Sequence, residues 1–305
     1  MEKINKINHG KLNWINIVNP TQDDIDYLED KFDFHHLDFE DCLTTNQRAK
    51  IDRYDDYLFL ILHLPVKASD GSIASQELDI FVTDNTVITL HRNIDVLNKL
   101  FEDARDKIQV QENLMNQSPG YLIYTILNSL YETGFTLLDT LTAEASELEK
   151  EVFDIDLTTD KLKDILALKK DLINFRRIIL PQRSVIAQLE HIYMGNNNSE
   201  DLEVYFDNIV DKIEKIYSIL ENQKEIVASL QETNEAIIFH NTNNIIRVLT
   251  VFSVIMMPLS VITGFFGMNV DLPIANNPIA YFAILIFMFA VLAIMLIFFR
   301  FKKWL

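Results

Sequence analysis

Hydrophobic and polar positions follow three different patterns along the 305 residues of the chain. Before about residue 115, short runs rich in Val, Ile, Leu and Phe alternate with segments whose apolar residues recur at three- and four-residue steps. The short runs, bounded by turn signals, predict strands at 12–18, 58–64, 78–82 and 87–90. The periodic segments predict helices at 23–32 and 93–108. A mixed α/β domain is therefore expected over residues 1–115.

The middle of the chain carries helical patterns only. Residues 121–153 and 159–194 both have helical periodicity. Pro181 is expected to kink the second helix, because proline lacks a backbone N–H and clashes with the preceding turn. The two segments predict a helical hairpin over residues 116–199.

A third long helix is predicted after this hairpin. From residue 200 to Met257 the sequence contains neither glycine nor proline. A single helix over 202–266 is about 100 Å long, too long to lie on its own small domain. Residues 200–266 are therefore predicted to form a stalk that runs from the cytosol into a membrane. Its early apolar stripe consists of Ile209, Ile213, Ile216 and Leu220.

The last part of the chain contains two uncharged apolar runs. Residues 248–266 hold 19 residues without a charge, and residues 279–299 hold 21. As a helix, each run is about 30 Å long, which matches the hydrocarbon core of a bilayer. Both runs are predicted to span a membrane, joined by a loop at 267–278 and followed by a basic tail at 300–305.

Basic residues beside the two spans predict the topology. The loop contains no Lys or Arg, whereas Arg247 precedes the first span and Arg300, Lys302 and Lys303 follow the second. Because Lys and Arg are enriched on the cytoplasmic side of membrane helices, both termini are expected in the cytoplasm and the loop outside. The start of the chain has no apolar signal-peptide core. The prediction is a multi-pass protein of the cell membrane, plasma or inner.

The part before the spans is strongly acidic. The formal net charge of the chain is −18, and residues 248–305 contribute +2, so residues 1–247 carry −20. This charge argues against nucleic acid as a partner, because nucleic acids bind basic patches. It is compatible both with plain solubility and with attraction of cations. The single cysteine, Cys42, excludes an intramolecular disulfide. Without a phosphate-binding loop or a nucleophile elbow, an enzyme is not expected.

One face of the first span is small or polar. Heptad steps along the helix select Asn243, Ile246, Thr250, Ser253, Met257, Ser260, Gly264 and Gly267. Small residues in a membrane helix are typical of tight helix packing. A hydroxylated stripe with a 3.5-residue period, continuing a stalk that oligomerises, equally suits several copies of the helix around a polar pore. The pattern alone leaves both interpretations open.

Several motifs together resemble the CorA family of divalent-cation transporters. Near the C-terminus they are Met257-Pro258-Leu259-Ser260, Gly264-Phe265-Phe266-Gly267-Met268-Asn269 and Lys302-Lys303-Trp304-Leu305. Earlier matches are the segments 37–41, 47–51, 57–60, 147–153 and 176–181. The resemblance covers nearly the whole chain in order, and the chain is identified as a member of this family.

The resemblance implies a homopentameric funnel around one axial pore. Its fold class is an α+β membrane protein with a cytosolic α/β domain, a helical stalk and two C-terminal transmembrane helices per subunit. Gly267, Met268 and Asn269 would form the selectivity filter, and Asp271 would be the acidic residue of the loop. The residues that would line the pore are Asn243, Ile246, Leu249, Ser253, Met257, Ser260 and Gly264.

The resemblance also implies a regulatory divalent-cation site in the cytosolic part. Glu40 and Asp41 match acidic residues that bind such an ion against a stalk aspartate of the neighbouring subunit. At the aligned stalk position this chain has Asn208, with Asp207 beside it and Asp211 one turn further on. The predicted regulatory ligands are therefore Glu40, Asp41, Asp207 and Asp211.

The function implied by the resemblance is channel-like import of hydrated Mg²⁺, with Co²⁺ and Ni²⁺ as further candidate substrates. The membrane potential would drive the ion, and cytosolic Mg²⁺ would inhibit its passage. The expected partners are copies of the chain, the lipid bilayer and divalent cations, with no nucleic acid. One alternative is a ZntB-like zinc transporter of the same architecture. An alternative of another class is a membrane-tethered acidic sensor or scaffold, which would have no use for a polar face on its first span.

Overall fold

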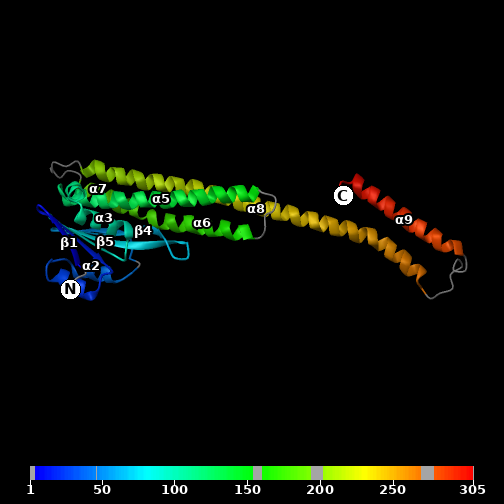
Figure 1. Cartoon of the computed structure of the whole chain (residues 1–305), viewed down its shortest axis with the longest axis horizontal. Helices are drawn as coiled ribbons and strands as arrows, with labels where there is room; N and C mark the ends of the chain where they lie inside the picture. The colour runs from blue at the N-terminus through cyan, green and yellow to red at the C-terminus, as the bar shows by residue number, and fades with distance from the viewer. Residues whose placement is uncertain (1–3, 46, 154–159, 194–201, 269–277, 305) are drawn as a thin grey trace. The chain divides into compact units, whose positions relative to one another are not determined.

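The computed structural model describes residues 4–45, 47–153, 160–193, 202–268 and 278–304. The chain divides into two compact units, Met1–Gln231 and Glu232–Leu305 (Figure 1). The first unit contains one sheet and most of the helices. The second contains the C-terminal part of one long helix, followed by the last helix.

A six-stranded mixed sheet lies at the centre of the first unit. Its strands are β1 (Ile4–His9), β2 (Leu12–Val18), β3 (Lys50–Arg53), β4 (Leu58–Lys67), β5 (Ile73–Val82) and β6 (Thr86–His91). Their order across the sheet is β1-β2-β6-β5-β4-β3. Only the neighbours β2 and β6 are parallel, with Ile15 opposite Ile88, and every other neighbouring pair is antiparallel.

Helices cover both faces of this sheet. On one face, α1 (Gln22–Glu29) and α2 (His36–Leu43) enclose a core that includes Phe39 and Phe81. On the other, Phe101 of α3 (Asp95–Asp106) meets the ring of Trp14 edge-on at 4.9 Å. Burial on both faces explains why the central strands have continuous apolar runs rather than alternating ones.

The remaining helices of the first unit pack as a bundle on the α3 side of the sheet (Figure 1). They are α4 (Ile108–Met115), α5 (Pro119–Phe153), α6 (Asp160–Ile179), α7 (Gln182–Tyr193) and the N-terminal part of α8 (Leu202–Phe266). The apolar stripe predicted from Ile209 to Leu220 is fully buried in this bundle. The kink expected at Pro181 is a complete break, because α6 ends at Ile179 and α7 starts afresh at Gln182.

The second unit is a pair of apolar helices. Residues 232–266 belong to α8, and α9 spans Pro278–Phe301. By length and composition, α8 and residues Tyr281–Phe301 can each cross a membrane. Val251 and Ile255 of α8 form a small buried cluster with Phe299 of α9. At the end of α9, the chain turns at Lys303, which has φ +56°, and the Trp304 ring lies 5.9 Å from that of Phe299.

Candidate functional site

The face of α8 that packs on α9 is defined by residues four positions apart. Val251 and Ile255 are buried, and Leu259 packs against the same cluster as Leu292 and Met295. At about 100° per residue, this face comprises roughly a third of the helix circumference. The rest of the membrane part of α8 has no cover within the described chain.

The predicted pore-lining residues all lie on the uncovered side. Leu249, Ser253 and Ser260 are about 160–200° around the helix from Val251. Leu249 is 63% exposed and Met257 67% exposed, and the other predicted pore residues are exposed as well. Gly264 also faces open space, since a Cβ added there meets nothing within 4 Å. The helix therefore has one face that packs on α9 and an opposite, partly polar face that is exposed within the described chain.

Hydroxyl groups near this face donate their hydrogens to the helix itself. Ser253 Oγ donates to the carbonyl oxygen of Leu249 at 2.9 Å, and Thr250 Oγ1 donates to that of Ile246 at 2.7 Å. Each hydroxyl oxygen keeps lone pairs that can accept further hydrogen bonds. Such an oxygen is suited to the water shell of a cation, because waters around a cation point their hydrogens outward.

Gly267 directly follows α8 at the predicted filter. Its N–H donates to the carbonyl oxygen of Thr263 at 2.9 Å. A Cβ on Gly267 would lie 2.9 Å from that same oxygen, so a larger residue would disturb the helix end. Met268 follows with its side chain 55% exposed. The other two residues predicted here, Asn269 and Asp271, lie outside the described residues.

The four predicted regulatory acids lie in the first unit. Glu40 and Asp41 are on α2, and Asp207 and Asp211 are exposed on α8. Within one chain they do not form a metal site. Among the described residues, no group of three or more His, Cys, Asp or Glu is placed to hold a metal ion.

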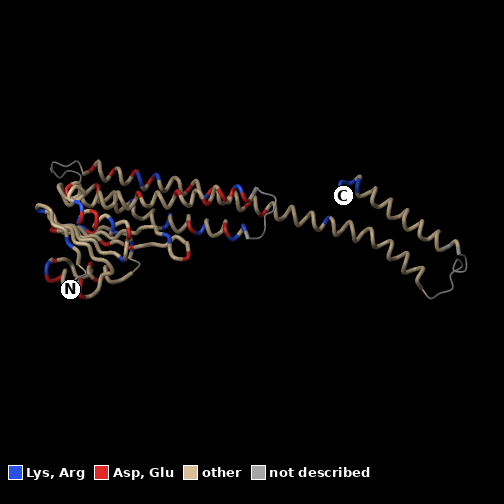
Figure 2. The backbone as a smooth tube through the Cα atoms, viewed as in Figure 1, with Lys and Arg blue, Asp and Glu red and all other residues tan. Residues whose placement is uncertain are grey.

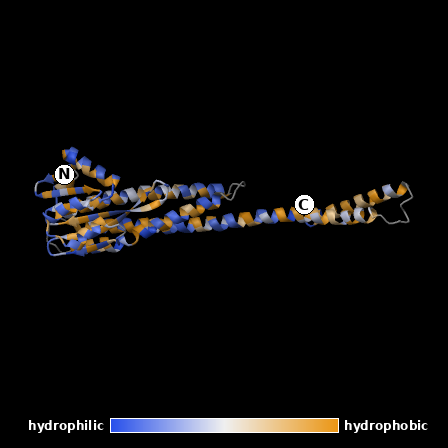
Figure 3. Ribbon diagram, turned by 90° about the horizontal axis from the view of Figure 1, so that it is seen from below, coloured by the Kyte–Doolittle hydropathy of each residue, from blue (hydrophilic) through white to orange (hydrophobic). Residues whose placement is uncertain are grey.

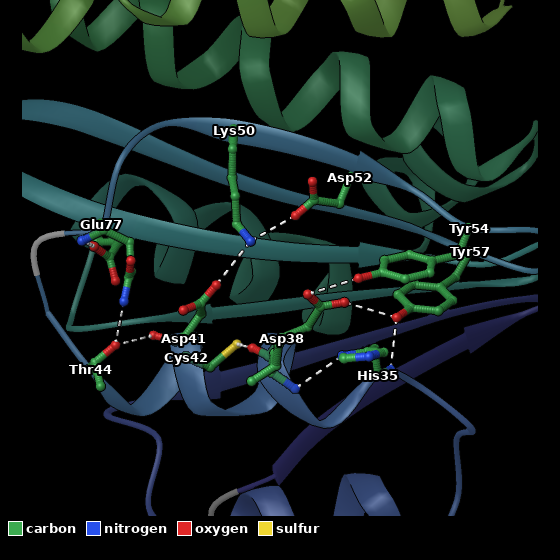
Figure 4. A network of polar contacts seen from close by, with 12 residues as sticks. His35, Asp38, Asp41, Cys42, Thr44, Lys50, Asp52, Tyr54, Tyr57 and Glu77 are labelled. Atoms are coloured by element: carbon green, nitrogen blue, oxygen red, sulfur yellow. Dashed lines mark hydrogen bonds and ion pairs between the residues drawn. The ribbon is translucent and has the colours of Figure 1, made fainter.

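Asp41 already has a cationic partner that the sequence analysis did not identify. Lys50 Nζ lies 2.9 Å from Asp41 Oδ2 and 2.7 Å from Asp52 Oδ2 (Figure 4). The signal that could have revealed this is the alternation Lys50-Ile51-Asp52, which places both charges on the same face of a strand. Glu40 has a weaker partner, because its carboxylate lies 3.4 Å from the ring of His36 and both side chains are exposed.

A buried carboxyl group anchors α2 to the sheet. Asp38 is 2% exposed and accepts hydrogen bonds from the hydroxyls of Tyr57 at 2.8 Å and Tyr54 at 3.2 Å (Figure 4). Burial raises the pKa of Asp38, although both tyrosine hydrogen bonds oppose that shift. Tyr57 in turn accepts the N–H of His35, the residue that caps α2. The helix that carries Glu40 and Asp41 is thus held firmly in place.

An α/β unit, one long helix and an apolar two-helix hairpin together define a two-span membrane protein. The family model described as "CorA-like Mg2+ transporter protein" matches residues 9–303. The chain therefore belongs to the CorA-like Mg²⁺ transporter family, as its motifs predicted. Members of this family are ion transporters, so the chain is not an enzyme.

Individual relatives agree with the family model. The chain is 29% identical to the putative metal ion transporter YfjQ of Bacillus subtilis, covering 95% of this chain and 89% of that protein. It is 27% identical to the cobalt/magnesium transport protein CorA of Thermotoga maritima, covering 96% and 83% respectively. The solved structure of the CorA magnesium transporter from Methanocaldococcus jannaschii matches with a TM-score of 0.83 at 23% identity, covering 98% and 94%. This likeness confirms the predicted fold of the single chain, with an N-terminal α/β domain, a long helix and two C-terminal apolar helices.

Proposed function

We propose that the chain assembles as a homopentamer that imports hydrated Mg²⁺ through one axial pore. The observation that carries this proposal is the division of α8 into two faces. Val251 and Ile255 pack on α9, whereas the predicted pore residues are exposed on the opposite side. Packing five copies with α9 outermost would bring the uncovered faces together around an axis. A scaffold that only needs an anchor has no reason to keep such a face polar.

The residue types on this face suit an ion that keeps its water. Mg²⁺ releases its first water shell reluctantly. Ser253 offers a hydroxyl oxygen whose hydrogen is already used within the helix, so it accepts hydrogen bonds from those waters. A ring of Asn269 carboxamides at the outer mouth would do the same without a negative charge. A neutral ring lets the ion leave again, which conduction requires.

The apolar residues Ile246 and Leu249 would form the neck of the pore. They are 53% and 63% exposed in the chain, and five such rings facing one axis would exclude water when they approach closely. Once the neck is wet, the membrane potential drives entry. The driving force is about 2.3 kcal/mol per charge per 100 mV, so a divalent ion gains about twice that.

Flux into liposomes tests the proposal directly. Purified protein is reconstituted, and influx of Mg²⁺, Co²⁺, Ni²⁺ and Zn²⁺ is compared with an imposed potential and with an imposed proton gradient. Potential-driven Mg²⁺ influx that ignores the proton gradient supports the proposal. Zinc influx that requires a proton gradient would favour the ZntB-like alternative, and no influx of any ion would contradict both.

The orientation proposed from the Lys and Arg distribution puts residues 267–278 outside and both termini in the cytoplasm. A cysteine introduced at Asn276 should react with an impermeant thiol reagent on intact cells, and one at Asn196 should not. The native Cys42 should contribute little background labelling, because it is 2% exposed and burial raises its thiol pKa well above the usual value. The reverse labelling pattern would contradict this topology.

Cytosolic Mg²⁺ is proposed to close the pore through the acidic part of the chain. Residues 1–247 carry −20, so five copies repel one another. An ion that bridges Glu40 or Asp41 of one subunit to Asp207 or Asp211 of the next would relieve this repulsion. Because the ion would bind the closed arrangement better, it would stabilise that arrangement by mass action. Protease protection by millimolar Mg²⁺ that disappears in Glu40→Gln/Asp41→Asn would support this regulation, and equal digestion of all samples would contradict it.

A further inference from the structure

Lys50 places a positive charge where the proposed regulatory ion would bind. It is the first residue of β3, and its ammonium group lies between the carboxylates of Asp41 and Asp52, at 2.9 and 2.7 Å (Figure 4). Asp41 belongs to α2 and Asp52 to β3, so the lysine joins two elements. The carboxylate of Asp41 is thus already paired with a cation that belongs to the chain itself.

The surroundings of Lys50 hold its side chain in this position. The ammonium lies 5.1 Å from the centre of the Phe59 ring, which stabilises a cation. Burial disfavours the charged form, but hydrogen bonds to Asp52 and Asp41 raise the pKa of Lys50 above its usual value. The lysine therefore remains charged at any pH at which the protein works.

Carboxylates are also the ligands that divalent cations prefer. The same negative oxygen atoms that bind the ammonium can therefore also attract a divalent cation. Of the two α2 residues proposed as regulatory ligands, only Asp41 is engaged in this way, since Glu40 is exposed and contacts His36 instead. A divalent ion that binds Asp41 competes with the ammonium for this carboxylate, whereas Asp52 can retain the ammonium.

We propose that Lys50 is a tethered counter-cation that competes with divalent ions for Asp41, and so sets the Mg²⁺ concentration at which the regulatory site fills. This inference rests on the regulatory part of the proposed function. In the absence of the ion, Lys50 neutralises Asp41 and keeps α2 joined to β3. When the ion binds, the ammonium shifts wholly onto Asp52, which keeps the displaced charge paired and limits the cost of the exchange.

The test measures the Mg²⁺ concentration that half-protects the purified full-length protein from a protease. Lys50→Met should lower that concentration about three- to tenfold, because the competing charge is gone while an apolar stem remains on Phe59. Lys50→Arg, which keeps the charge, should stay near the wild type. Lys107→Met is a matched control, since it removes a lysine paired with Asp103 at 2.6 Å on α3. Thermal melts show whether each variant is folded.

The dependence on Asp41 makes the result specific. In an Asp41→Asn background, Lys50→Met should change nothing, because the ligand for which it competes is gone. If Asp41→Asn raises the protecting concentration but Lys50→Met leaves it at the wild-type value, the competition is refuted while the regulatory site stands. If Asp41→Asn leaves the protection unchanged, the regulatory site itself is refuted and this inference with it.

Discussion

The two units of the chain differ in how far their apolar side chains are exposed. In the first unit, Trp14, Phe59 and Phe81 are 0% exposed. In the second, Ile279 and Phe289 are about 70% exposed, at 71% and 68%. In Figure 3, orange and pale colours predominate along the two C-terminal helices, whereas blue and orange residues are interspersed over the first unit. The first unit buries its apolar surface against itself, whereas the second leaves that surface for a bilayer or for other copies.

Charges follow the same division. Lys, Arg, Asp and Glu are spread over the elements of the first unit, and none lies along residues 248–268 or 278–299 (Figure 2). Several charges of the first unit are paired across elements, as Arg183 of α7 is with Glu214 of α8 at 2.6 Å. Along these two uncharged stretches of the second unit, polarity comes from neutral side chains such as Ser253. Neutral oxygens on a membrane helix cost less than charges, and they are sufficient to contact a hydrated ion.

The largest effect is expected at Asn269, the proposed filter residue between the two apolar helices of the second unit. Asn269→Ala should reduce Mg²⁺ influx to the background of empty liposomes, because it would remove the amides that we propose accept hydrogen bonds from the hydrated ion. Assembly, measured by size-exclusion chromatography with light scattering, should be unchanged. Asn276→Ala, another asparagine of the same loop, is the matched control and should transport normally. Asn269→Asp should retain ion binding but conduct poorly, since a ring of charges holds the ion. Wild-type influx by a well-folded Asn269→Ala protein would falsify the filter assignment.

Strong periodic signals made most of the fold predictable. The strand expected at 12–18 is β2 without any change of bounds, and the buried stripe of α8 was predicted residue by residue. The elements that were missed are β1, β3, α2 and α4. Only one of the six residues of β1 is buried and none of the four residues of β3, because both are edge strands, so they lack the apolar run that marks a central strand. The eight residues of α2 include three Asp or Glu, and Asp38 occupies a core position that an apolar residue would normally mark.

The candidate site was predictable in part. A heptad step selected the small and polar face of α8, and the structure places the predicted pore residues on the side away from α9. The proposed partners of that face are other copies of the chain, so a single sequence pattern could not distinguish a pore from a packing seam. Lys50 was missed because its role depends on Asp41, which belongs to another element. Contacts between distant segments of this kind leave no periodic signal.

A matched pair of phenylalanines sharpens the contrast in burial. Phe81→Ala should reduce the free energy of unfolding of the first unit by about 3–5 kcal/mol, through lost burial and the cavity left behind. Phe289→Ala, at an exposed position of α9, should cost less than about 0.5 kcal/mol. Because the chain has two tryptophans, Trp14 fluorescence in a Trp304→Phe background reports the first unit, and Trp304 fluorescence in a Trp14→Phe background reports the second. The Phe81 variant should melt roughly 6–20 °C lower, and equal losses at both positions would refute the contrast.

The smallest effect concerns pH and is expected in the first unit only. His91 is 2% exposed; its Nδ1 accepts the N–H of Ile94 at 2.9 Å, and its Nε2 lies 3.1 Å from the Asn16 side chain. Burial lowers the pKa of His91 from 6.5 to about 4. The unfolded chain therefore takes up a proton near pH 6.5 that the folded chain refuses until about pH 4. As the pH is lowered through that window, the free energy of unfolding therefore decreases, by about 2 kcal/mol between pH 7 and pH 5.

Replacing His91 with asparagine isolates this effect. The amide oxygen of Asn can accept the Ile94 N–H but does not titrate, so the melting temperature of His91→Asn should fall less between pH 7 and pH 5. The expected difference is roughly 4–8 °C, read from Trp14 fluorescence in the same background. Asp38 and Asp79 act in the opposite sense, because burial raises their pKa and the folded state then gains protons first as the pH falls. Both carboxyl groups are present in the two proteins, so their contribution cancels in the comparison. Parallel pH profiles for wild type and variant would show that His91 is not the group that makes the first unit sensitive to acid.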